Sequence, residues 1–222
     1  MSTADRRRIR RRILSWVPIT VVAVICAGFV VAANVMQDSW WSAPEPTAAA
    51  DQRSAKGMSV FTGTGIDYLT RDGYLKVELR DASESARSLG LDSDGSRTFE
   101  PIVPINAIML GADGVIDLDL VRSVTVVSED DRVAAVELLT DNDGAWTAAY
   151  AEVADVTSEW GFTPDDLDAL RDDLTERSRS ADGMPYRAAL AEREYHGARV
   201  SAEIAVDPAA SQVTARFVVK PL

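Results

Sequence analysis

The chain has 222 residues and a formal net charge of −12, from 35 acidic and 23 basic side chains. This length suffices for one ordinary domain and a short additional segment. So acidic a surface repels phosphate backbones, which excludes nucleic acid as an expected partner. With one cysteine and one histidine, the chain has no intrachain disulfide and too few ligands for an ordinary structural zinc site.

The first twelve residues form a basic tail. They carry a net charge of +5, so the rest of the chain carries −17. The arginines of this tail are Arg6, Arg7, Arg8, Arg10, Arg11 and Arg12. Cationic flanks of a membrane helix stay on the cytoplasmic side, so we predict that residues 1–12 are cytoplasmic and set the topology.

An uncharged apolar segment follows the tail, since residues 13–37 contain no Asp, Glu, Lys or Arg. At about 1.5 Å per residue, a helix of this length crosses a hydrocarbon core of roughly 30 Å. Trp16 lies near one end, and Trp40 and Trp41 lie just past the other, where indole rings favour lipid headgroups. We therefore predict a single transmembrane helix with these tryptophans as membrane anchors and with lipid as a partner. The domain that follows is then extracytoplasmic.

Alternatives to a permanent anchor start from the same residues. A cleaved secretory signal has an apolar run of about 7–15 residues, and residues 31–33, Val-Ala-Ala, offer a cleavage site. The run in this chain is longer, which favours an anchor. The arginine pairs are also compatible with a twin-arginine export signal. A lipoprotein is disfavoured because Cys26 lies in mid-segment after the bulky Ile25.

Residues 38–57 are rich in Ala and Pro and poor in large apolar side chains, which predicts a flexible linker. Residues 58–222 are then an acidic extracytoplasmic domain. Lysine is rare while Arg, Ala, Asp and Val are abundant, a bias typical of GC-rich bacterial genomes.

Alternating apolar residues predict strands in both halves of this domain. The clearest are residues 74–80, 200–206 and 213–219; further strands are expected over 59–69, 99–110, 115–118, 120–128 and 133–139. A tight turn is expected at Asp72-Gly73, a mobile loop over residues 81–97, and an edge strand where Pro101 and Pro104 interrupt residues 99–110.

Between these strands the period changes to that of a helix. Apolar residues recur at three or four positions from Trp146 to Trp160, and Gly161 is a plausible stop. Thr163 and Pro164 then provide an N-cap and a first helical residue for a second helix, which should end near residues 177–178. The predicted fold class is α+β, with this αα-hairpin packed on one face of a mainly antiparallel sheet.

The sequence offers little for catalysis. His196 is the only imidazole, no Gly-x-Ser-x-Gly motif accompanies it, and we expect it in a turn or at an edge. Acidic residues gather over 92–95, 113–119 and 141–144, but none of these segments completes a calcium loop, and Asp-Gly pairs are common in turns. No phosphate-binding glycine loop is present. We therefore predict no catalytic residues, no metal and no cofactor.

These features favour a single-pass interaction domain, an accessory or scaffold subunit of a bacterial envelope complex with protein partners in the envelope. The alternatives are a tethered or secreted hydrolase that uses two carboxylates, and a domain that senses a small ligand or a cation.

Overall fold

The computed structural model describes residues 48–80, 83–142 and 145–222. The predicted basic tail, the transmembrane helix and its three tryptophans lie outside these ranges. Within them, no helix is both long and apolar enough to cross a membrane. The compact unit begins at Ala48. Residues 48–57, which the sequence assigns to the linker, belong to this unit, and Arg53 forms a β-bridge with Ser59.

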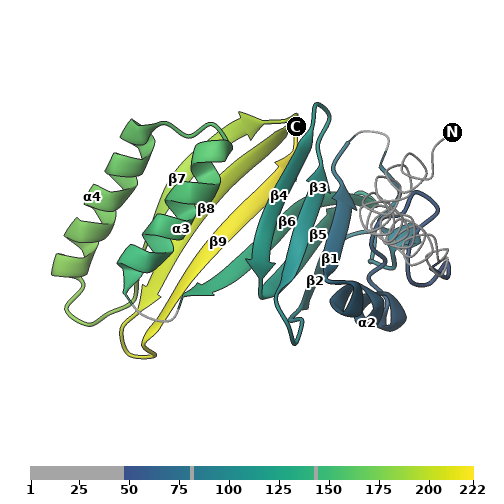
Figure 1. Ribbon diagram of the computed structural model, residues 1–222, viewed down its shortest axis with the longest axis horizontal. Coiled ribbons are helices and arrows are strands. Elements are labelled where there is room, and N and C mark those ends of the chain that lie inside the picture. Colours follow the sequence, from purple (N-terminus) through teal and green to yellow (C-terminus); the bar gives the residue numbers. More distant parts are fainter. Residues whose placement is uncertain (1–47, 81–82, 143–144) are drawn as a thin grey trace, which may run out of the picture. The chain divides into compact units, whose positions relative to one another are not determined.

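The described chain is an α+β domain with mostly antiparallel sheets (Figure 1). Its helices are α2 (Gly63–Asp72), the short 3₁₀ helix η1 (Arg87–Leu89), α3 (Trp146–Glu159) and α4 (Pro164–Ser180). Its strands are β1 (Tyr74–Glu78), β2 (Gly95–Phe99), β3 (Ile105–Leu110), β4 (Val115–Val121), β5 (Ser123–Glu129), β6 (Arg132–Asn142), β7 (Tyr186–Tyr195), β8 (Ala198–Asp207) and β9 (Gln212–Pro221).

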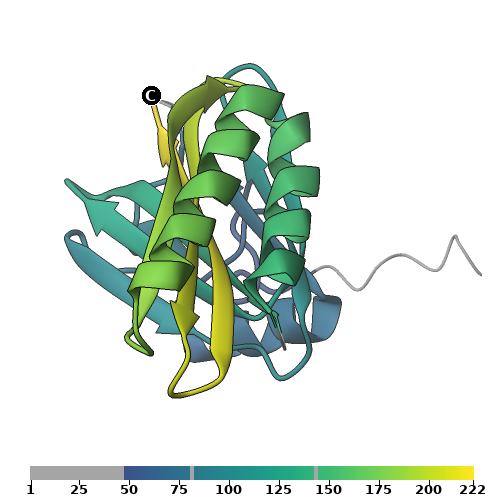
Figure 2. The same ribbon diagram turned by 90° about the vertical axis from the view of Figure 1, so that its left-hand side faces the viewer.

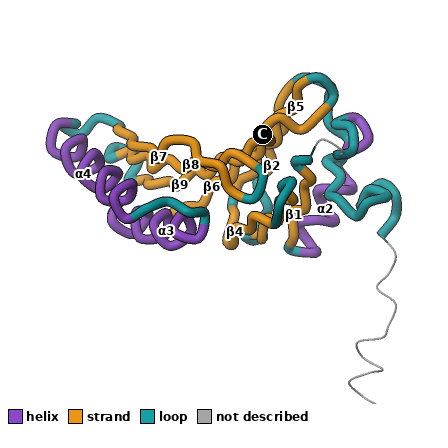
Figure 3. Tube along the Cα trace, turned by 90° about the horizontal axis from the view of Figure 1, so that it is seen from above, coloured by secondary structure: helices purple, strands orange, loops and turns teal. Residues whose placement is uncertain are grey.

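The strands form two sheets. The large sheet has the order β2-β5-β6-β9-β8-β7, and the small sheet has the order β1-β3-β4. Helices α3 and α4 contact the large sheet through β6, β7, β8 and β9. Figure 3 shows these helices and the small sheet along the same side of the large sheet, which leaves its other face open.

One continuous apolar core lies between the large sheet and the elements that cover it. Alternate residues of β8 and β9 point into it, including Ile204 and Phe217, which are fully buried. The ring of Trp160 packs edge-on against that of Phe217, with 5.5 Å between the ring centroids. The αα-hairpin thus covers one face of the large sheet, as predicted.

Local chemistry explains the helical hairpin. Gly161 adopts φ 79° after α3, and Thr163 caps α4 by accepting a hydrogen bond from the backbone N–H of Asp166. The Asp166 carboxylate accepts one in return from the backbone N–H of Thr163, which completes a capping box. Helix α4 ends at Ser180, slightly beyond the predicted end.

The predicted strand over residues 59–69 is wrong, because α2 occupies most of it. The Thr62 hydroxyl accepts a hydrogen bond from the Gly65 N–H at the start of α2, and Gly73 ends the helix in the left-handed region. A Cβ on Gly65 would collide with the Val60 carbonyl, so only glycine permits this close approach. Asp72-Gly73 therefore ends a helix instead of turning a hairpin, and β1 pairs parallel with β3.

The predicted mobile loop over residues 81–97 is also wrong in its described part. It contains η1 and most of β2, and the side chains of Ala86, Leu89 and Leu91 are buried in the core. These three apolar residues stand among serines and aspartates, so the segment shows no sustained period of a helix or a strand.

The interrupted edge strand over residues 99–110 divides into two strands. Strand β2 ends at Phe99, both prolines lie in the connection, and β3 is the central strand of the small sheet.

Strand β7 was not predicted, because a bulge between Leu190 and Arg193 breaks its alternation. The predicted C-terminal hairpin of β8 and β9 is confirmed. Its turn is stabilised by the Asp207 carboxylate, which accepts hydrogen bonds from the backbone N–H groups of Ala209 and Ala210.

Candidate functional site

Of the acidic clusters, the first stabilises a turn and the second lies largely on a strand that faces solvent. Within the described ranges, no three residues of the His, Cys, Asp or Glu type are placed to bind a metal together. The Asp94 carboxylate accepts a hydrogen bond of 2.9 Å from the Asp130 backbone N–H, and this bond, with a second from Ser93, lowers the pKa of Asp94. Asp117 and Asp119 point from β4 into solvent. The side chains of the third cluster, residues 141–144, lie outside the described part of the chain.

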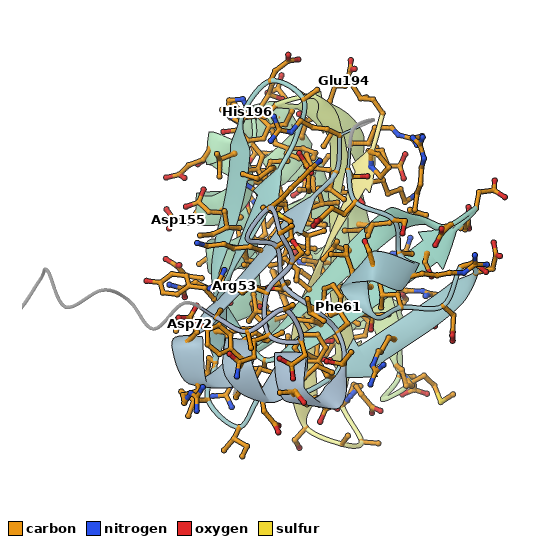
Figure 4. The ribbon with its side chains drawn as sticks, turned by 90° about the vertical axis from the view of Figure 1, so that its right-hand side faces the viewer. Arg53, Phe61, Asp72, Asp155, Glu194 and His196 are labelled. Carbon is orange, nitrogen blue, oxygen red and sulfur yellow. The ribbon has the colours of Figure 1, made fainter. Side chains whose placement is uncertain are left out.

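His196 lies in the turn between β7 and β8, which confirms its predicted position (Figure 4). It adopts φ 49°, and its ring packs against that of Tyr195 with 4.0 Å between the centroids. Its backbone carbonyl accepts a hydrogen bond of 3.1 Å from the Asp113 N–H in the β3–β4 turn. His196 therefore joins two turns, one from each sheet.

A hollow of about 370 Å³ lies between α4 and β7, which are neighbours in Figure 2. It is lined by carboxylates from both elements, as the hydrolase alternative requires. Asp166 pairs with Arg193 at 2.9 Å, Asp173 pairs with Arg177 at 2.7 Å, and Glu192 pairs with Lys220.

The pKa shifts in this hollow point away from acid catalysis. Hydrogen bonds from Thr163 lower the pKa of Asp166, and the Lys220 ammonium group lowers the pKa of Glu192. A general acid in glycoside hydrolysis needs a raised pKa. The hollow therefore gives no support to the hydrolase alternative.

The open face of the large sheet carries hydroxyl groups and ion pairs beside half-buried apolar side chains such as Val127, Leu139 and Val218. The hydroxyls of Thr98 and Thr125 are 2.8 Å apart across β2 and β5. Glu137 and Arg216 form an ion pair of 2.6 Å across β6 and β9. A further ion pair on this face joins Arg187 and Glu203. A sheet with one face on the core normally has such a solvated second face.

The face of the small sheet that points away from the core differs. We call it the outer face, and it consists of Tyr74, Lys76, Glu78, Asn106, Ile108, Leu110, Val115, Asp117 and Asp119. In the register, Lys76 pairs with Ile108, which pairs with Asp117, and Leu110 pairs with Val115. Tyr74 and Val115 are 43% and 49% exposed. No described helix or strand lies over this face (Figures 1 and 3).

A second apolar group, which we call the tip, lies at one end of the small sheet. It consists of Ile102, Val103 and Leu120, whose exposed fractions are 95%, 63% and 66%. Ile102 and Val103 precede β3. Leu120 precedes Val121, which pairs with Ile105, the first residue of β3. Five of the seven exposed large apolar residues in the described chain thus belong to the outer face or the tip.

No protein-family model matches this chain, and neither the curated proteins nor the solved structures include one that matches it.

The outer face and the tip were not predicted from the sequence. Their strands were largely expected, but which side of each strand faces the core depends on how the two sheets pack. The only local signal was the Pro-Ile-Val-Pro sequence at residues 101–104, which sets two apolar side chains between two breaks in the strand pattern. The predicted anchor tryptophans and topology arginines lie outside the described residues.

Proposed function

We propose that this chain is a membrane-anchored, extracytoplasmic interaction domain, an accessory or scaffold subunit of a bacterial envelope complex. The observation that carries the proposal is the apolar outer face of the small sheet. Contiguous exposed apolar surface on a folded domain marks sites where a partner binds.

The comparison between the two sheets supports this assignment. Both sheets cover the same core with one face, and the same solvent acts on the other. The open face of the large sheet carries cross-strand ion pairs and its large apolar side chains are half-buried, whereas Tyr74 and Val115 on the outer face of the small sheet are 43% and 49% exposed. Because solvation alone favours polar residues at such positions, the apolar outer face is better explained by a protein surface that covers it.

The sequence supports the membrane anchor and its direction. An uncharged run over residues 13–37 follows six arginines, so the N-terminus is cytoplasmic and the domain is outside. Alkaline carbonate leaves such a protein in the membrane, and protease added to spheroplasts degrades the domain. Release by carbonate, or full protection from protease, refutes this topology.

The contact surface is tested by purifying the full-length chain from its native membranes in mild detergent. We expect the chain to elute as part of a larger complex, and Tyr74→Ser combined with Val115→Asp to release it. The matched control combines Met184→Ser with Leu222→Asp, which changes two apolar residues that are more exposed than Tyr74 and Val115 and lie away from the outer face. If the wild-type chain elutes alone, or if both pairs act equally, the outer face is not the contact.

A further inference from the structure

We propose that the tip rests on a lipid surface, with Ile102, Val103 and Leu120 at the boundary between headgroups and acyl chains. This inference rests on the membrane anchor of the proposed function. It assigns a separate occupant to the end of the small sheet, whereas the outer face remains the surface for protein partners.

The tip is the most exposed apolar group of the described chain. Ile102 is almost fully exposed, and Val103 and Leu120 are about two-thirds exposed. They gather at one end because Ile105 pairs with Val121, so the loop before β3 and the end of β4 meet there. A contiguous apolar projection of this kind loses unfavourable water contact when it enters a lipid interface.

The tip is also held in place before any contact is made. Pro101 and Pro104 fix two φ angles in the loop, and the flanking Phe99 and Ile105 are buried in the core. Little conformational entropy therefore remains to be lost when the loop meets a surface.

Leu120 points to the same conclusion from its backbone. It adopts φ 59°, in the left-handed region, which is energetically unfavourable for a residue that has a Cβ atom. This kink lies where the register between β3 and β4 shifts, just before the chain passes into the large sheet. Asparagine adopts this backbone conformation at lower cost, and the leucine side chain remains 66% exposed within the described domain. Contact with lipid supplies the missing burial.

The chain enters the domain at the same end. Arg53 forms an ion pair with Asp72, the last residue of α2, and Figure 4 shows these two side chains close together, away from His196. Two residues later, Tyr74 begins β1 beside Asn106 of β3. If residues 13–37 span the membrane, only ten residues separate that helix from Ala48. Ten residues reach at most roughly 36 Å, so this end of the domain is within reach of the bilayer.

The charges around the tip favour lipid with no net charge. The exposed side chains of Arg71 and Arg122 lie at this end, and Glu100 and Asp119 flank the tip, so the local charges balance. The remainder of the chain is strongly acidic, which opposes approach to anionic lipid. The occupant is therefore a phosphatidylcholine-like or other zwitterionic surface.

The test uses the full-length chain with Cys26→Ala, reconstituted in phosphatidylcholine nanodiscs. Val103→Cys carries an environment-sensitive fluorophore, and Leu222→Cys carries it in the matched control. Leu222 follows Pro221, which pairs with Ala198 beside the His196 turn, and so lies at the opposite end. We expect spin-labelled lipid to lower the fluorescence at position 103 at least about twofold and to leave position 222 nearly unchanged.

A second substitution checks the tip itself. Leu120→Asp should restore the fluorescence at position 103, whereas Met184→Asp, at a similarly exposed apolar residue just before β7, should not. Increasing the fraction of phosphatidylglycerol should also restore it. Equal quenching at positions 103 and 222, no quenching at either, or crosslinking of position 103 to protein in native membranes overturns the proposal. Failure to insert into the nanodisc refutes the membrane anchor as well, whereas an inserted chain without quenching refutes only the lipid contact.

Discussion

The contact between the β3–β4 turn and the β7–β8 turn allows a sharp stability prediction. A Cβ on Gly111 would collide with the backbone carbonyl of His196, which accepts the hydrogen bond from Asp113. A Cβ on Gly114 would instead lie 2.6 Å from Cγ of the His196 ring. The two glycines therefore touch the same residue through different atoms.

The expected costs follow from those atoms. Overpacking costs about 1–3 kcal/mol, so Gly114→Ala should destabilise the domain by that amount. Gly111→Ala also breaks the Asp113 hydrogen bond, whose net contribution is about 0.5–1.5 kcal/mol because both residues are exposed, so its total cost should be about 1.5–4.5 kcal/mol. Removing the ring with His196→Ala should reduce the cost of Gly114→Ala to below about 0.5 kcal/mol and leave that of Gly111→Ala almost unchanged.

Thermal unfolding followed by circular dichroism measures this double-mutant cycle. For a domain of this size, each kcal/mol corresponds to a change in Tm of about 2–4 °C. If Gly114→Ala costs the same with and without the histidine ring, the ring does not pack on Gly114 and the reasoning fails. If His196→Ala also rescues Gly111→Ala, the backbone contact is wrong.

Three further predictions concern single residues. Thr163→Ala removes the cap of α4 and should lower the free energy of unfolding by about 1 kcal/mol, measured by urea denaturation, whereas Ser178→Ala on the exposed side of the helix should not. The hydrogen bonds with Thr163 are the main cause of the lowered pKa of Asp166 in the folded state. The ionised carboxylate therefore stabilises the fold at pH values above the ordinary pKa of aspartate, and this stabilisation is lost as the pH falls through the lowered pKa. Unfolding midpoints between pH 6 and pH 2 should therefore fall less steeply in Asp166→Asn than in wild type, and parallel curves would contradict this. Leu120→Asn should raise the free energy of unfolding by about 0.5–1 kcal/mol, because asparagine tolerates the left-handed region and little burial is lost; a lower Tm would show that Leu120 is not strained.

Short-range chemistry made much of the fold predictable. The hairpin of α3 and α4 follows from Gly161, Thr163 and Pro164, which act within one turn of a helix end. The strands β1, β8 and β9 follow from alternation over several residues, because a strand with one face on a core must place apolar residues at every second position. Turn residues such as Asp207 act on their own backbone neighbours.

The wrong predictions share a physical cause. Residues 59–69 contain apolar side chains that satisfy both a strand and a helix, and the close approach of Gly65 to the Val60 carbonyl exists only in the folded domain. The bulge between Leu190 and Arg193 interrupts the alternation of β7, and this bulge forms only when β7 pairs with β8. The parallel pairing of β1 with β3 joins segments about thirty residues apart, and no local signal specifies such a partner.

By itself, the sequence determined the α+β class, the helical hairpin and the charge pattern from which an N-terminal anchor is predicted. These properties depend on residues that are neighbours along the chain. The tertiary structure decided that the strands divide into two sheets, that the turn of His196 meets the turn of Gly111, and that one sheet presents an apolar outer face and tip. Which side of a strand meets solvent depends on what packs against the other side, and that packing partner lies far away in the sequence.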